Sequence, residues 1–169
     1  MERSDIERIR AILRRWGDCD AQIRYQCERM SEARASIEAM YLIYKSPELD
    51  GMPRSTVPGN PTEAAALRIE TCIHVFEQTV ENCTAAIKEL NEFKAIVSAL
   101  VAALPRQERD VIVYVYLDHM DMIAAATLTG VSERTGYNRE MSALERINEL
   151  EQSALERIGK NLRVESAGR

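Results

Sequence analysis

The amino-acid sequence predicts an all-α protein in which a long antiparallel helical hairpin, a coiled coil, precedes a compact helix-turn-helix. The composition favours helices, because 5% of the 169 residues are aromatic and there are only 7 glycines and 5 prolines. Apolar residues recur in alternating steps of three and four over residues 6–44 and again over 66–104. A turn signature follows at residues 129–132. The predicted domains are a hairpin over 1–104, a helix-turn-helix module over 105–158 and a flexible tail over 159–169.

The first predicted helix carries a coiled-coil seam with a period of 3.5 residues. Only Asp20 and Arg34 interrupt its apolar stripe. The apolar positions of the seam are Ile6, Ile9, Leu13, Trp16, Ile23, Cys27, Met30, Ile37, Tyr41 and Tyr44.

A loop over residues 45–61 separates the two seams, because its prolines and glycines are incompatible with a continuous helix. Asn60, Pro61 and Glu63 then form a helix start, with a capping side chain, a proline at the first position and a carboxylate in the first turn. Lys94 is the single polar interruption of the second seam. Its apolar positions are Ala66, Ile69, Ile73, Phe76, Val80, Cys83, Ile87, Leu90, Val97, Val101 and Leu104.

Two seams of equal length joined by a loop fold most simply as an antiparallel hairpin, roughly 60 Å long at 1.5 Å per residue. Aligning Tyr44 with Ala66 brings Asp20 close to Lys94, so we expect these side chains to pair inside the seam and fix its register. The alternative is that both side chains extend to solvent. Such a stripe can also join two chains, so a homodimer is a further alternative.

The predicted module after the hairpin begins at Pro105, which ends the second long helix. A new helix over 106–117 has an apolar side formed by Val111, Ile112, Val115 and Tyr116. The next helix is expected to bury Ile123, Ala126 and Leu128. Gly130 then supplies a left-handed backbone, Val131 fills the angle between the helices, and Ser132 caps the second helix of the motif.

In helix-turn-helix proteins the second helix lies in the DNA major groove, with its N-terminal residues nearest the bases. Arg134 and Arg139 are candidates for guanine or phosphate, and Asn138 for adenine. The full set of candidate DNA-binding residues is Ser132, Arg134, Thr135, Tyr137, Asn138, Arg139 and Arg146. The alternative is an ordinary solvated helix face. A net charge of -5, and glutamates that match the local arginines, predict weak intrinsic affinity for DNA.

Residues 104–112 read Leu-Pro-Arg-Gln-Glu-Arg-Asp-Val-Ile, and Tyr116-Leu117-Asp118 follows. This pattern resembles the opening of region four of bacterial sigma factors, and the similarity continues to Ile147. His119 stands where that pattern has a glycine. The whole chain resembles small phage and prophage regulators of the ArpU/RinA kind. The resemblance implies a sequence-specific regulator that binds double-stranded DNA at a promoter or operator and acts on late or packaging genes, with RNA polymerase as a further partner.

The segment Ser-Ala-Leu-Glu-Arg-Ile occurs at 142–147 and again at 153–158. A spacing of eleven residues is nearly three helical turns, so both copies present one apolar edge, which can dock on the hairpin or dimerise. Gly159 is expected to end this helix.

Other functional classes find little support in the sequence. There is no glycine-rich phosphate loop and no H-E-x-x-H, so neither an enzyme nor a cofactor is expected. The 4 cysteines form no C-x-x-C pair and are expected to be buried, reduced thiols without a metal. No signal peptide or membrane-spanning run is present, which predicts a cytoplasmic protein without a membrane partner. The main rival is a non-catalytic coiled-coil adaptor or inhibitor that binds RNA polymerase or another regulator.

Overall fold

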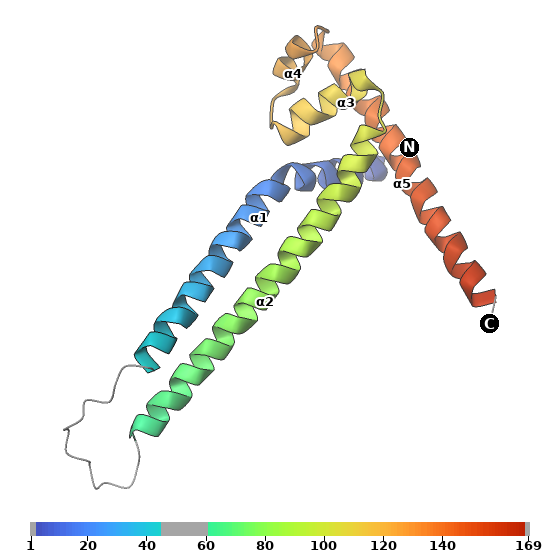
Figure 1. Ribbon diagram of the computed structural model, residues 1–169. Coiled ribbons are helices and arrows are strands. Elements are labelled where there is room, and N and C mark those ends of the chain that lie inside the picture. Colours follow the sequence, from blue (N-terminus) through green and yellow to red (C-terminus); the bar gives the residue numbers. More distant parts are fainter. Residues whose placement is uncertain (1–2, 45–60, 168–169) are drawn as a thin grey trace. The chain divides into compact units, whose positions relative to one another are not determined.

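The computed structural model describes residues 3–44 and 61–167, and the side-chain surroundings of residues 3–42 and 67–152 (Figure 1). Within these ranges the chain is helical and contains no strand, which confirms the predicted all-α class. The elements in chain order are α1 (Arg3–Tyr44), α2 (Pro61–Ala102), α3 (Arg106–Ile112), the π-helix η1 (Val113–Leu117), α4 (Met122–Leu128) and α5 (Glu133–Ala167).

The two long helices form the predicted hairpin. Helices α1 and α2 have 42 residues each, which corresponds to about 60 Å at 1.5 Å per residue. Helix α2 begins at Pro61, as the sequence predicts. The predicted cap at Asn60 and the rest of the loop up to that residue lie outside the described residues.

The chain divides into two compact units. We call residues 1–20 and 91–169 the motif unit, and residues 21–90 the hairpin unit. Within each unit, segments of α1 and α2 lie side by side and run in opposite directions. This boundary differs from the predicted division at residue 104, because the start of α1 and the end of α2 share a core with the helix-turn-helix.

The core of the motif unit is one cluster of buried side chains. It consists of Ile9, Leu13 and Trp16 from α1, Val97 and Val101 from α2, Leu104, Ile112 from α3, Tyr116 from η1, and Ala143, Leu144 and Ile147 from α5. The indole nitrogen of Trp16 donates to the hydroxyl of Ser98 at 3.0 Å, so this tryptophan is buried with its polar atom bonded. The first Ser-Ala-Leu-Glu-Arg-Ile copy therefore docks on the hairpin helices.

The hairpin unit follows the predicted seam closely on α2 and less closely on α1. Ile73, Cys83 and Leu90 are buried at their predicted positions. On α1 the buried residue is Ala33, next to the predicted seam position Arg34, which is exposed. A small side chain permits close approach of the two helices, whereas the arginine keeps its charge in water.

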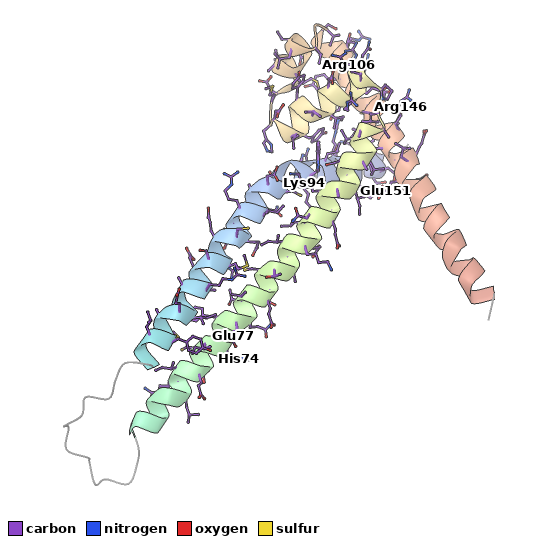
Figure 2. The ribbon with its side chains drawn as sticks, in the orientation of Figure 1. His74, Glu77, Lys94, Arg106, Arg146 and Glu151 are labelled. Atoms are coloured by element: carbon purple, nitrogen blue, oxygen red, sulfur yellow. The ribbon has the colours of Figure 1, made fainter. Side chains whose placement is uncertain are left out.

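The predicted ion pair between the long helices is confirmed, but its predicted burial is wrong. The ammonium of Lys94 donates to the carboxylate of Asp20 at 2.5 Å (Figure 2). The Lys94 side chain is 34% exposed and the Asp20 side chain 59% exposed. The two groups thus meet at the solvent edge of the seam, where the ammonium and the carboxylate can bind each other and still contact water.

The last helix extends further than the sequence predicts. Helix α5 continues through Gly159 to Ala167, so the expectation that Gly159 ends the helix is wrong. One interior glycine costs about 1 kcal/mol of helix stability, which neighbouring residues can offset. Within the described ranges, no helix has both the length and the apolar character that crossing a bilayer requires.

Candidate nucleic-acid interface

The turn between α4 and α5 has the predicted geometry. Gly130 adopts a φ of 68°, in the left-handed region that glycine occupies without a steric penalty. The amide of Gly130 donates to the carbonyl of Thr127 at 3.1 Å, and the amide of Val131 donates to the carbonyl of Ala126 at 3.0 Å. This bonding pattern is a Schellman motif, which ends α4 and redirects the chain into α5.

The buried face of α4 differs from the prediction. Asp121 caps the helix by accepting the amide hydrogen of Ala124 at 2.7 Å, and this start sets the helix phase. The buried residues are Met122, Ala125 and Ala126. Ile123 is 61% exposed and Leu128 is 59% exposed, so two of the three predicted core positions are wrong. The buried residues follow the helical spacing i, i+3 and i+4 counted from Met122, whereas the prediction started the buried face at Ile123.

Ser132 caps α5 as predicted. Its hydroxyl accepts the amide hydrogen of Thr135 at 3.2 Å and lies 2.8 Å from the Thr135 hydroxyl. Because both hydroxyls sit at the first turn of the helix, they lie among backbone amides that carry partial positive charge. This arrangement suits contact with a phosphate oxygen.

Helices α4 and α5 approach closely at Gly136. A Cβ atom there would lie 2.9 Å from the sulfur of Met122 and 3.4 Å from the Cβ of Ala126. The glycine is itself the contact that packs the two helices of the motif. Tyr137 is 48% exposed, so its side chain is available to a partner.

The first two turns of α5 bring five of the seven candidate residues together. Ser132, Arg134, Tyr137 and Asn138 are exposed, and Thr135 is half-buried. Arg134 and Asn138 are one turn apart and therefore share a face of the helix. The polar side of the helix start is open to solvent, as a DNA contact requires.

The remaining two arginines turn toward α3. Arg139 is half-buried and donates to the side-chain oxygen of Gln107 at 3.0 Å. Arg146 lies two turns further along α5, and its guanidinium is 3.1 Å from the carboxylate of Glu108 (Figure 2). Glu108 also accepts from the hydroxyl of Ser142 at 2.9 Å. Arg139 thus borders the exposed face, whereas Arg146 is bound to α3, away from that face.

A buried carboxylate lies directly beneath the exposed face. Glu140 is 4% exposed and accepts a hydrogen bond from the Tyr116 hydroxyl at 2.6 Å. The guanidinium of Arg10 donates to the same carboxylate at 3.3 Å. Burial and the bond to Glu140 raise the pKa of Tyr116 far above its ordinary value, so the phenol stays protonated. Glu140, which is next to Arg139 in the sequence, is therefore paired with Arg10 of α1.

Helix α1 also holds α5 through Arg8 and packs on η1 through Gly17. Arg8 donates to Glu151, which is labelled in Figure 2, and to Asn148, both at 2.8 Å. Gly17 packs on η1 so closely that a Cβ atom would lie 1.9 Å from the carbonyl oxygen of Tyr116. The sequence does not predict these roles of Arg8 and Gly17, because a polar or small residue beside an apolar stripe is common on helices and does not indicate a contact.

The connection between η1 and α4 uses an uncommon backbone conformation. His119 has a φ of 53°, which favours glycine, and it stands where the sigma region-four pattern has glycine. The amide of Met120 donates to the carbonyl of Tyr114 at 2.9 Å and closes this turn. A histidine here thus adopts a left-handed backbone conformation that glycine adopts without a steric penalty.

The cysteines are partly as predicted. All four are free thiols: Cys19 and Cys83 are buried, whereas Cys27 and Cys72 are exposed and contradict the expected burial. Burial raises the pKa of the Cys19 thiol. Among the described residues, no group of three or more His, Cys, Asp or Glu side chains is arranged to hold a metal ion.

Comparisons of this chain with protein-family models, curated proteins and solved structures give no match. What the exposed face binds has to follow from its own geometry and charge.

Proposed function

We propose that this protein is a sequence-specific DNA-binding regulator that inserts the first turns of α5 into the major groove. One observation carries the proposal. The Gly130 turn and the Ser132 cap form a complete helix-turn-helix whose second helix presents Arg134 and Asn138 to solvent. Arginine pairs with guanine and asparagine with adenine in the major groove, so this face carries the side chains that base recognition uses.

The charges near the start of α5 favour this proposal more than the net charge of the whole chain does. Glu140 is buried and bonded to Arg10, and Arg146 is bonded to Glu108. Neither glutamate lies on the exposed side of the helix start. Glu133 is the acidic residue next to Arg134 in the first turn of α5. Charges on more distant helices are screened beyond about 10 Å.

The target and context follow from the resemblance to sigma region four and to phage regulators of the ArpU/RinA kind. That resemblance supports a promoter or operator as the site, late or packaging genes as the regulated set, and RNA polymerase as a further partner. The sigma region-four resemblance spans residues 104–147, the part of the chain in which the turn and the cap lie, and the resemblance to the phage regulators extends over the whole chain.

Selection of duplexes from a random pool by the full-length chain tests the proposal. We expect one enriched motif, and an affinity for it that falls linearly on a plot of log K against log salt. Arg134→Ala should weaken binding to the motif about tenfold, because a bidentate base contact provides about 1–3 kcal/mol. The matched control is Arg24→Ala, an exposed arginine in the hairpin unit, which should leave affinity unchanged. No enrichment, or equal effects of both variants, contradicts the proposal.

A specific observation also favours the adaptor alternative. Helix α4 exposes Ile123 and Leu128, whose apolar side chains suit a protein surface better than a phosphate backbone. Substituting both by Glu should abolish binding to purified RNA polymerase if α4 is the contact, while duplex binding by α5 persists.

A further inference from the structure

A cleft with a volume of about 410 Å³ lies in the motif unit beside the exposed face of α5. Arg14 of α1 and Tyr137 of α5 line it from two helices, and Met120 and Asp121 line it from the segment before α4. Tyr137 also lies between Arg134 and Asn138 in the exposed first turns of α5. The cleft is therefore continuous with the face proposed to enter the major groove.

The charges around the cleft leave one arginine uncommitted. Arg10 and Glu140, which also line it, bind each other, and the Tyr116 hydroxyl donates to Glu140. Asp121 accepts the amide hydrogen of Ala124 as the cap of α4. Arg14 is exposed and has no ion-pair or hydrogen-bond partner among the residues whose side chains are described.

We infer that this cleft binds a phosphate of the DNA backbone, held by the Arg14 guanidinium and the Tyr137 hydroxyl. The inference rests on the proposed function. A helix about 10–12 Å wide fills a major groove about 12 Å wide, so backbone phosphates run along both of its sides. Side chains that flank the inserted helix meet those phosphates, and arginine and tyrosine are both phosphate donors.

The consequence is that α1 is part of the DNA-binding surface. Arg14 is more than a hundred residues away from the motif in sequence, so a search for the helix-turn-helix alone does not include it. Its guanidinium can bond two phosphate oxygens at once, which adds orientation as well as attraction. This contact would help fix the angle at which α5 enters the groove.

The test measures binding of full-length variants to the selected duplex and to a scrambled duplex by fluorescence anisotropy. Arg14→Ala should weaken binding to both duplexes by the same factor, about five- to tenfold, and should lower the salt slope by about 1. Arg14→Lys should keep most of the slope, because one cation still neutralises the phosphate. Tyr137→Phe should weaken binding a few-fold without changing the slope.

Phosphate ethylation interference gives a second readout. The wild type should show an interfering phosphate that Arg14→Ala no longer shows, whereas the control Arg24→Ala keeps the wild-type pattern. If the wild type binds its duplex and Arg14→Ala binds with the same affinity, slope and interference pattern, the inference is overturned and the proposed function stands. If the wild type binds no duplex, both are overturned.

Discussion

At the scale of single residues, the exposed face of α5 depends on what lies beneath it. Glu140 is a buried carboxylate, and leaving such a group without partners costs several kcal/mol. Tyr116 and Arg10 satisfy it from two other elements. These bonds fix the rotation of α5 and so determine which of its side chains reach solvent.

Replacing Tyr116 by phenylalanine tests this role. The change removes a hydrogen bond to a charged acceptor and should lower the free energy of unfolding by about 1.5–3 kcal/mol at neutral pH. Denaturant unfolding followed by circular dichroism measures the difference. Equal stability of the two proteins at neutral pH would contradict a structural role for the bond.

The difference in stability between the wild type and Tyr116→Phe should also depend on pH. The folded pKa of Tyr116 is raised above the ordinary value of 10.0, so folding keeps a proton on the phenol. The stabilisation from the protonated phenol is fully present below pH 10.0 and is lost as the pH rises further. The advantage of the wild type over Tyr116→Phe should therefore shrink above that pH. An advantage that grows with rising pH would contradict the assignment.

The sequence could not reveal this network, because the partners are far apart in the chain. Arg10 and Glu140 are 130 residues apart, and the nearest charges to Glu140 in sequence suggest Arg139 instead. Helix periodicity places Glu140 on the buried side only once the helix phase is known. The turn at Gly130 and the cap at Ser132 were predictable because their chemistry is local.

At the scale of elements, helix ends marked by proline were predicted well and helix phase was predicted less well. Pro61 begins α2 and Pro105 follows the end of the hairpin, since proline acts on its own backbone and on the preceding residue. The phase of α4 was wrong by one residue because a run of small and apolar residues offers two similar faces. The Asp121 cap decides between them.

The ion pair across the hairpin gives a prediction about α1 and α2. Asp20 and Lys94 occupy seam positions but are partly exposed, so their attraction provides at most about 1 kcal/mol. Replacing both with leucine adds apolar contact along the seam and should raise the melting temperature by a few degrees. Thermal unfolding of the double variant measures this shift.

The single variants complete that test. Asp20→Leu alone leaves the half-buried Lys94 ammonium without its partner, and should melt below the double variant. A melting temperature of the double variant below that of the wild type would contradict the seam assignment. Such a result would mean that the pair itself stabilises the hairpin more than apolar packing does.

At the scale of the whole molecule, the helix-turn-helix does not have a core of its own. The buried cluster of the motif unit includes residues that lie outside residues 105–158: Ile9, Leu13, Trp16, Val97, Val101 and Leu104. The sequence suggested a module joined to a hairpin because the helix pattern changes at Pro105. A change in pattern marks the end of a helix, however, and does not show which helices share a core.

This arrangement predicts how fragments of the chain behave. Residues 105–158 alone lose more than half of the buried cluster, together with the Arg10 and Arg8 contacts to α5, and should be largely unfolded. A chain in which a short glycine-serine loop replaces residues 21–90 keeps the motif unit intact, because Asp20 lies beside Lys94. It should unfold cooperatively and bind the selected duplex with wild-type affinity. Dispersed amide signals from the 105–158 fragment in solution, with duplex binding retained, would show instead that the hairpin ends are dispensable to the motif.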